Sequence, residues 1–219
     1  MFIAIVPAYN EEKIIGPVVR DLLAHVDKVV VVDDGSSDAT SEIAQHSGAF
    51  VLRHAINRGQ GAALETGDEY ARITEAHYVL HFDADGQFDV SDIKPALEQL
   101  KFAEADMLFG SRFLGKKSNM PLFKKIILLS VGRFVNKLFG GLQLSDVHNG
   151  FRILNKRALD CVGIRQDGMA HATEIISLVK KNKLKFIEFP VVVTYHEYGQ
   201  GLRSGIGIIK DLLWKNFLK

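Results

Sequence analysis

The chain has 219 residues, of which 47% are hydrophobic and 24% are charged, and its 27 basic residues nearly balance its 26 acidic ones. This composition is typical of a globular protein, and the small net charge excludes nucleic-acid binding through bulk positive charge. A single cysteine, Cys161, excludes an internal disulfide and favours a reducing, cytoplasmic compartment. The length fits one large domain, and we expect residues 1–219 to form it.

Short apolar runs alternate with helical patterns through the first half of the chain. The expected strands are Phe2–Val6, Lys28–Val32, Ala49–Arg53, Tyr78–Phe82 and Asp106–Gly110. The expected helices are one that follows Asn10–Glu12, Thr40–His46, one from Asn57–Gly61 to about Glu75, and Ser91–Ala103. We expect Pro7 to end the first strand and Asn10–Glu12 to cap the first helix. This alternation predicts an α/β fold with a mostly parallel, Rossmann-like central sheet flanked by helices.

The second half of the chain is less regular. Its expected elements are a helix over Pro121–Phe139 with a basic edge, a loop that enters a strand over Asp146–Leu154, a helix over Thr173–Lys181, a strand over Phe186–Tyr195 interrupted by Pro190, and an amphipathic helix over Gly205–Leu218. The glycine-rich segment Glu197–Ser204 is expected to act as a mobile lid.

The stretch His77–Asp89 is central, because an expected strand ends there at Asp83 and Asp85. In an extended backbone alternate side chains share a face, so the two carboxylates repel each other unless a cation lies between them. Oxygen ligands without histidine or cysteine suit Mg²⁺ or Mn²⁺, and the side-chain carbonyl of Gln87 can join them. The alternative is a solvated turn in which an aspartate caps the next helix.

Three polar segments follow the ends of expected strands, and this coincidence favours a binding site over a solvated turn. They are Pro7–Glu11, Asp33–Ser36 and Asp83–Gln87. Ligands of parallel sheets bind beyond the carboxyl ends of the strands, so we expect these segments to line one site. The segment Asn57–Gly67 does not fit a dinucleotide fingerprint, because Leu64 occupies the position of the third glycine.

Six motifs in order carry a resemblance to one family. They are PAYNEE at Pro7–Glu12, DDGSSD at Asp33–Asp38, NRGQGAALETG at Asn57–Gly67, DADGQ at Asp83–Gln87, GSR at Gly110–Arg112 and NGFR at Asn149–Arg152. Over about residues 1–200 the chain resembles family 2 glycosyltransferases of the GT-A fold, above all the dolichyl- and polyprenyl-phosphate mannosyl- and glucosyltransferases. The resemblance implies a nucleotide-sugar half over about residues 1–112 and an acceptor half over about residues 113–219.

The resemblance also implies roles for individual residues. Those that match the nucleotide pocket are Pro7, Tyr9, Asn10, Glu11, Asp34 and Ala84, and those that match the metal site are Asp83, Asp85 and Gln87. Arg112 matches an arginine near the acceptor phosphate, while Asp146 and Arg152 match the acidic and basic ends of a D-x-x-x-GFR segment. Asn149 stands where the family often has serine or cysteine.

We expect an inverting, metal-dependent enzyme that moves a hexose from a nucleotide sugar, of the GDP-mannose or UDP-glucose type, to a polyprenyl phosphate. Mg²⁺ or Mn²⁺ would stabilise the leaving diphosphate, and Arg203 in the lid would add a second positive charge. A lipid phosphate is largely dianionic and needs no base, whereas a sugar hydroxyl needs one, for which Asp146 is the candidate. His148 and His171 are other candidate bases or structural residues, and Glu174 is either a pocket residue or a solvated charge.

Two other functions stay open. One is a glycosyltransferase of surface polysaccharide synthesis with a hydroxyl acceptor, and the other is a non-catalytic nucleotide-sugar-binding partner of a membrane protein, which the intact metal motif disfavours. The helix at Gly205–Leu218 carries Trp214 near lysines, so it either packs on the core or lies on a membrane surface. We therefore expect a cytoplasmic protein that can bind the cytoplasmic membrane face peripherally.

Overall fold

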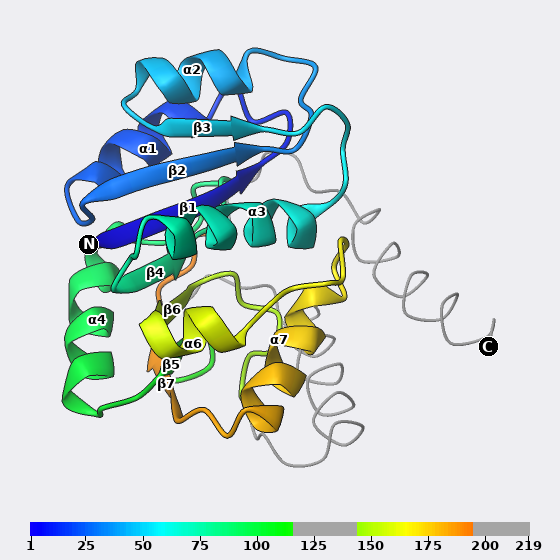
Figure 1. Ribbon diagram of the computed structural model, residues 1–219. Coiled ribbons are helices and arrows are strands. Elements are labelled where there is room, and N and C mark those ends of the chain that lie inside the picture. Colours follow the sequence, from blue (N-terminus) through cyan, green and yellow to red (C-terminus); the bar gives the residue numbers. More distant parts are fainter. Residues whose placement is uncertain (116–143, 195–219) are drawn as a thin grey trace.

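A computed structural model describes residues 1–115 and 144–194. These residues form a seven-stranded sheet with the order β3-β2-β1-β4-β6-β5-β7 (Figure 1). The strands are β1 (Phe2–Ala8), β2 (Lys28–Asp33), β3 (Phe50–Arg53), β4 (Tyr78–His81), β5 (Met107–Ser111), β6 (Arg152–Asn155) and β7 (Phe186–Pro190). The helices are α1 (Ile15–Leu23), α2 (Thr40–His46), α3 (Gln60–Ile73), α4 (Ile93–Phe102), α6 (Lys156–Cys161) and α7 (His171–Lys181), with a 3₁₀ turn, η1 (Val90–Asp92), before α4.

The expected mostly parallel sheet is confirmed. The pairings of β1 with β2, β1 with β4, β2 with β3 and β5 with β7 are all parallel, and the arrows of β1, β2 and β3 point to the same edge in Figure 1. The direction of β6 was not predicted, and β6 is antiparallel to both of its neighbours, β4 and β5. Gly110 N donates to Phe151 O at 2.8 Å, and Ser111 Oγ lies 2.6 Å from Ser145 Oγ. β6 therefore begins at the edge of the sheet where β5 ends and runs alongside β5 in the opposite direction.

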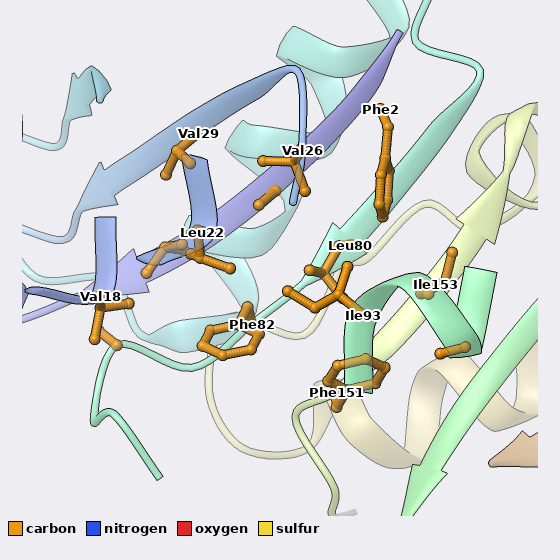
Figure 2. Packing of buried hydrophobic residues seen from close by; sticks show 14 of the residues in the cluster. Phe2, Val18, Leu22, Val26, Val29, Leu80, Phe82, Ile93, Phe151 and Ile153 are labelled. Atoms are coloured by element: carbon orange, nitrogen blue, oxygen red, sulfur yellow. The ribbon is translucent and has the colours of Figure 1, made fainter. Parts of the chain in front are cut away.

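Helices cover both faces of the sheet and enclose two hydrophobic cores. One core contains residues of α1, α2 and α4, and the other contains residues of α3, α6 and α7. Figure 2 shows Phe82, which comes directly before Asp83, in the first core together with Leu22 of α1 and with Phe151. Phe82 and Phe151 are 1% and 0% exposed, and their ring centroids lie 6.3 Å apart. Burial of such a side chain stabilises the fold by about 1.5–3 kcal/mol, so both rings anchor the segments attached to them.

Two local predictions near the first strand are wrong. β1 continues through Pro7 to Ala8. Alternate residues of a parallel strand direct their N–H groups to opposite neighbours, and Pro7 faces the side of β4, whose pairing with β1 ends at Ile5. The N–H group that proline lacks would therefore have had no partner in β4. Asn10–Glu12 does not cap α1, whose N-cap is Ile14 without a side-chain hydrogen bond. Instead Glu12 Oε2 accepts a hydrogen bond from Ala39 N at 3.2 Å, which ties this segment to the start of α2.

The other described elements lie within a few residues of their expected ranges, and the short helix α6 was not predicted. β7 ends at Pro190, where the sequence indicated an interruption. The helices expected at Pro121–Phe139 and Gly205–Leu218, and the lid expected at Glu197–Ser204 with Arg203, lie outside the described residues. Within residues 1–115 and 144–194, no helix combines the length and the apolar character needed to cross a membrane.

Candidate active site

The polar turns after β1 and β2 are tied together at the carboxyl-terminal edge of the sheet. Asn10 N donates to Ser36 Oγ and Ser37 N donates to Asn10 Oδ1, both at 2.9 Å. Asn10 has a φ of 56°, a left-handed conformation that asparagine tolerates better than most residues. Tyr9, one residue earlier, is 48% exposed. The two turns thus form a fixed wall with an accessible aromatic ring.

Asp34, which directly follows β2, holds the loop that precedes α3. Its Oδ1 accepts from Arg58 N at 2.9 Å and its Oδ2 accepts from Gly59 N at 2.6 Å. His54 Nδ1 lies 2.7 Å from Asp34 Oδ1, and Asp34 is only 3% exposed. A nucleotide that approaches this carboxylate would therefore find both oxygens already bound by protein donors.

Three carboxylates influence one another beyond the ends of β1 and β4. Burial raises the pKa of Asp83 from 3.8 to about 6, and the charge of Asp85 adds to this rise, which two nearby arginines only partly offset. Burial also raises the pKa of Glu11, and Asp85 contributes there too. Asp85 therefore repels negative charge on both sides of it.

These carboxylates fit a divalent cation whose coordination is completed by groups that are not protein. In the described part of the chain, no group of three or more His, Cys, Asp or Glu could hold a metal ion by itself. Mg²⁺ is commonly bound through one or two carboxylates together with water and substrate phosphates, and a cation would relieve the repulsion between Asp83 and Asp85. Gln87 N donates to Asp85 Oδ1 at 3.1 Å, so the backbone of Gln87 orients Asp85, while a metal contact through its side chain stays a prediction.

Arg112 and Asp146 form a bidentate ion pair just after β5. Arg112 Nε donates to Asp146 Oδ2 and Arg112 Nη2 donates to Oδ1, each at 2.6 Å, and Arg112 N donates to Oδ2 at 3.1 Å. Asn149 Nδ2 donates to Asp146 Oδ2, also at 3.1 Å. Both oxygens of Asp146 are thus engaged, and the guanidinium plane of Arg112 is fixed.

Arg152 supplies a second positive charge from inside the protein. It pairs across the sheet with His81 and is 2% exposed. Burial lowers its pKa, whereas the charges of Asp83, Asp146 and Asp68 raise it. His81 Nε2 donates to Asp68 Oδ1 at 2.9 Å. Because a buried guanidinium is stable only when its charge is compensated, Arg152 links the carboxylates of Asp83 and Asp146 electrostatically.

Comparison with known proteins identifies the family. The profile described as Glycosyl transferase family 2 matches residues 3–163. The chain belongs to glycosyltransferase family 2. An uncharacterised protein of Methanocaldococcus jannaschii is 38% identical over 95% of this chain and 89% of its own length. The UDP-N-acetylglucosamine–dolichyl-phosphate N-acetylglucosaminyltransferase of Methanococcus voltae is 32% identical over 93% of this chain and 90% of its own length.

The expected GT-A fold is also confirmed. Glucosyl-3-phosphoglycerate synthase from Mycobacterium tuberculosis, crystallised with Mn²⁺ and UDP-glucose, superposes with a TM-score of 0.74. The alignment covers 97% of this chain and 76% of that chain at 19% identity, so it is the fold that the two proteins share. This family 2 glycosyltransferase thus has the architecture that its motifs indicated.

The histidines and the glutamate singled out in this glycosyltransferase differ in their surroundings. Burial and Arg152 lower the pKa of His171 to about 3, and its Nδ1 donates to Gly168 O at 2.9 Å, so it is a neutral residue that fixes the start of α7. Burial lowers the pKa of His148 too, and neither of its ring nitrogens has a hydrogen-bond partner among the described residues. Glu174 accepts from two backbone N–H groups at 2.9 and 2.8 Å, so it holds the loop before α7.

Most of the predicted site residues gather at this edge of the glycosyltransferase. Pro7 lies inside β1 and Ala84 is 5% exposed, and a nucleotide contact for either stays a prediction. Two residues were missed. Gln60 Nε2 donates to Asp83 Oδ1 at 2.9 Å, and a Cβ atom at Gly150 would overlap the carboxylate of Asp83. Both belong to motifs that the sequence displayed, but their contact with Asp83 depends on the folded chain.

Proposed function

We propose that this glycosyltransferase is a metal-dependent, inverting enzyme that transfers a hexose from a nucleoside diphosphate sugar to a polyprenyl or dolichyl phosphate. The observation that carries this proposal is the fixed, bidentate pairing of Arg112 with Asp146, in electrostatic contact with Asp83 of the metal motif. It provides positive charge for a phosphate and engages both carboxylate oxygens of Asp146 in hydrogen bonds to Arg112. The dolichyl-phosphate specificity in the name of the Methanococcus voltae relative agrees with it.

The donor half of the proposal rests on the acids at the ends of β1 and β4. Asp83 and Asp85 would hold the cation, and their raised energy when both are charged favours its binding. When bound, Mg²⁺ or Mn²⁺ would stabilise the negative charge of the departing diphosphate. Glu11 is close enough to feel the charge of Asp85, and both Glu11 and the exposed Tyr9 would contact the nucleotide. A GDP-mannose or a UDP-glucose type of donor fits this arrangement equally.

The acceptor half rests on the arginines. A lipid phosphate monoester is largely dianionic near neutral pH, so it attacks without loss of a proton. One phosphate oxygen forms a bond to the anomeric carbon while the bond from that carbon to the diphosphate oxygen breaks, and the electron pair leaves with the diphosphate. A single displacement of this kind inverts the anomeric centre. Arg112 would orient the phosphate through charge-assisted hydrogen bonds, and Arg152 would offset charge from the interior.

A sugar hydroxyl acceptor is the second candidate, and the same ion pair disfavours it. A hydroxyl must lose its proton to a base as it attacks. Both oxygens of Asp146 already accept hydrogen bonds from Arg112, and Oδ2 accepts another from Asn149, so this carboxylate already has a role in holding Arg112. A non-catalytic nucleotide-sugar-binding module for a membrane protein would have no use for a positioned arginine next to a metal motif.

The test assays the purified protein with Mn²⁺, a panel of nucleotide sugars, and either a short-chain prenyl phosphate or a simple sugar as acceptor. We expect transfer to the prenyl phosphate, which EDTA abolishes. Arg112→Lys and Asp146→Asn should both reduce this transfer at least tenfold and leave slow donor hydrolysis in place, because lysine cannot form the bidentate pair and asparagine leaves Arg112 unfixed. Arg157→Lys is the matched control, since Arg157 pairs with Asp106 at the surface through one nitrogen.

The opposite pattern would refute the proposal. If the wild type glycosylates only the sugar, and if Asp146→Asn alone is inactive, the acceptor is a hydroxyl and Asp146 is its base. A prenyl phosphate acceptor would also bring the protein to a membrane surface, and vesicle co-sedimentation of the full chain with and without the lipid phosphate would measure this binding. Two further parts of this proposal stay predictions. One is that residues 1–219 form a single domain whose nucleotide-sugar half ends at about residue 112, and the other is that Arg203 acts from a lid.

A further inference from the structure

Asp83 has neighbours that the proposed mechanism does not use. Gln60 Nε2 donates a hydrogen bond to Asp83 Oδ1 at 2.9 Å, although 23 residues separate the two in the sequence. A Cβ atom at Gly150 would overlap the carboxylate of Asp83, so the backbone of Gly150 packs directly against it. The carboxylate is therefore held between the first residue of α3 and the segment that leads into β6.

The backbone on both sides of Gln60 is fixed. Before it, Gly59 N donates to Asp34 Oδ2 at 2.6 Å. After it, Gly61 N donates to Asp167 O at 2.8 Å. Gly59 has a φ of 106°, and a Cβ atom there would overlap Asp167 O, so a residue with a side chain would not fit. The side chain of Gln60 thus extends from a fixed point toward Asp83.

The backbone on the Asp83 side of the contact is fixed as well. Phe82 and Phe151 flank the contact between Asp83 and Gly150 and lie in the same core (Figure 2). Phe88 packs on both, with ring centroids 5.5 Å from Phe82 and 5.9 Å from Phe151. The backbone next to Asp83 therefore cannot shift without disturbing this aromatic cluster.

A neutral donor suits the charges around Asp83. Asp85 places negative charge near it, and Arg152 and Arg112 already place positive charge near it. An amide N–H group also favours the ionised carboxylate, which is the form that binds a metal, and it adds no positive charge that would repel the cation. Carboxylates that bind metals are in general hydrogen-bonded by such outer groups, and loss of one typically weakens metal binding 10–100-fold.

We propose that Gln60 is a positioning residue for the metal site: it fixes the orientation of Asp83 before the cation binds. The inference rests on the proposed metal dependence. In this arrangement Asp83 is a ligand whose position is set in the free protein, anchored through Gln60 to the loop that Asp34 holds. The NRGQG motif then serves the metal site. Through the hydrogen bonds of Gly59 and Gln60, this motif joins Asp34, after β2, to Asp83, after β4.

The test measures the affinity for Mn²⁺ alone, without nucleotide, from the electron paramagnetic resonance signal of free Mn²⁺. Gln60→Leu removes the donor, and Gln60→Asn keeps the amide but is one methylene too short to reach Asp83. We expect both variants to bind Mn²⁺ about tenfold more weakly than the wild type. Gln99→Leu, on the exposed face of α4, is the matched control and should bind like the wild type. The unfolding midpoint in EDTA should stay near that of the wild type for all three.

The possible results separate this inference from the proposed function. If the wild type binds Mn²⁺ and Asp83→Asn does not, yet the Gln60 variants bind like the wild type, the positioning role is overturned and the metal site stands. Weaker binding that only accompanies a large drop of the unfolding midpoint in EDTA also overturns it, because Gln60 would then merely hold the fold. If the wild type binds no Mn²⁺ even after UDP or GDP is added, both the metal site and the role of Gln60 are refuted.

Discussion

Replacement of Asp83 by asparagine is expected to stabilise the metal-free protein. The pKa of Asp83 rises from 3.8 to about 6, and one pKa unit corresponds to about 1.4 kcal/mol, so ionised Asp83 costs the folded state up to about 3 kcal/mol. The folded protein binds the proton more tightly than the unfolded chain, so this cost is complete above pH 6 and disappears as the pH falls toward 3.8. Asparagine has no charge, and its side-chain oxygen can still accept the hydrogen bond from Gln60 Nε2. Asp83→Asn should therefore exceed the wild type in stability by up to about 3 kcal/mol at pH 8 and by about 1.5 kcal/mol at pH 5.

The assay is urea unfolding of both proteins in EDTA at pH 5 and pH 8, with Asp21→Asn, an exposed aspartate of α1, as the control. Addition of Mn²⁺ should then stabilise the wild type at pH 8 and leave Asp83→Asn unchanged, because the variant has lost a ligand. A variant that is less stable than the wild type at pH 8 in EDTA would refute the reasoning. A difference that does not shrink between pH 8 and pH 5 would show that charge on Asp83 is not its cause.

Three further predictions follow from individual contacts. Gly150→Ala should displace the carboxylate of Asp83 and weaken Mn²⁺ binding at least tenfold by the same resonance measurement, whereas Gly163→Ala, whose Cβ would enter open space, should not. His148→Leu should raise the free energy of unfolding of the substrate-free protein by about 1 kcal/mol in urea, because it removes two buried ring nitrogens that lack partners among the described residues; a loss of stability would contradict this. Asp34→Asn should lower that free energy by about 2 kcal/mol and expose the loop at Arg58 to limited proteolysis, since asparagine cannot accept from both backbone N–H groups, and unchanged proteolysis would place the loop's anchor elsewhere.

The sequence predicted β1, β2 and β4 well because each is an almost continuous apolar run, and it placed Asp83 at a strand end for the same reason. It could not predict the direction of β6, which depends on the edge at which the preceding loop returns. Resemblance singled out Arg112 and Asp146 separately, but they are 34 positions apart in the sequence, and only the folded chain shows that they form one ion pair. Asp34 was expected to face a nucleotide, and its bonds to a loop 24 and 25 residues away appear only in the folded chain.

Asp83 lies two residues after the end of β4, Arg112 directly follows β5, and Arg152 begins β6, which is hydrogen-bonded to both other strands. The chain leaves the sheet after Ser111 and is back beside the same point at Ser145, 2.6 Å away between the hydroxyl oxygens. The sheet therefore fixes where the stretch from Ser111 to Ser145 begins and where it ends, but not how many residues it contains. Between two fixed ends, each doubling of the length of a flexible segment costs only about 0.6 kcal/mol of closure entropy. Insertions or deletions between residues 116 and 143 are thus compatible with unchanged positions of Asp83, Arg112 and Arg152.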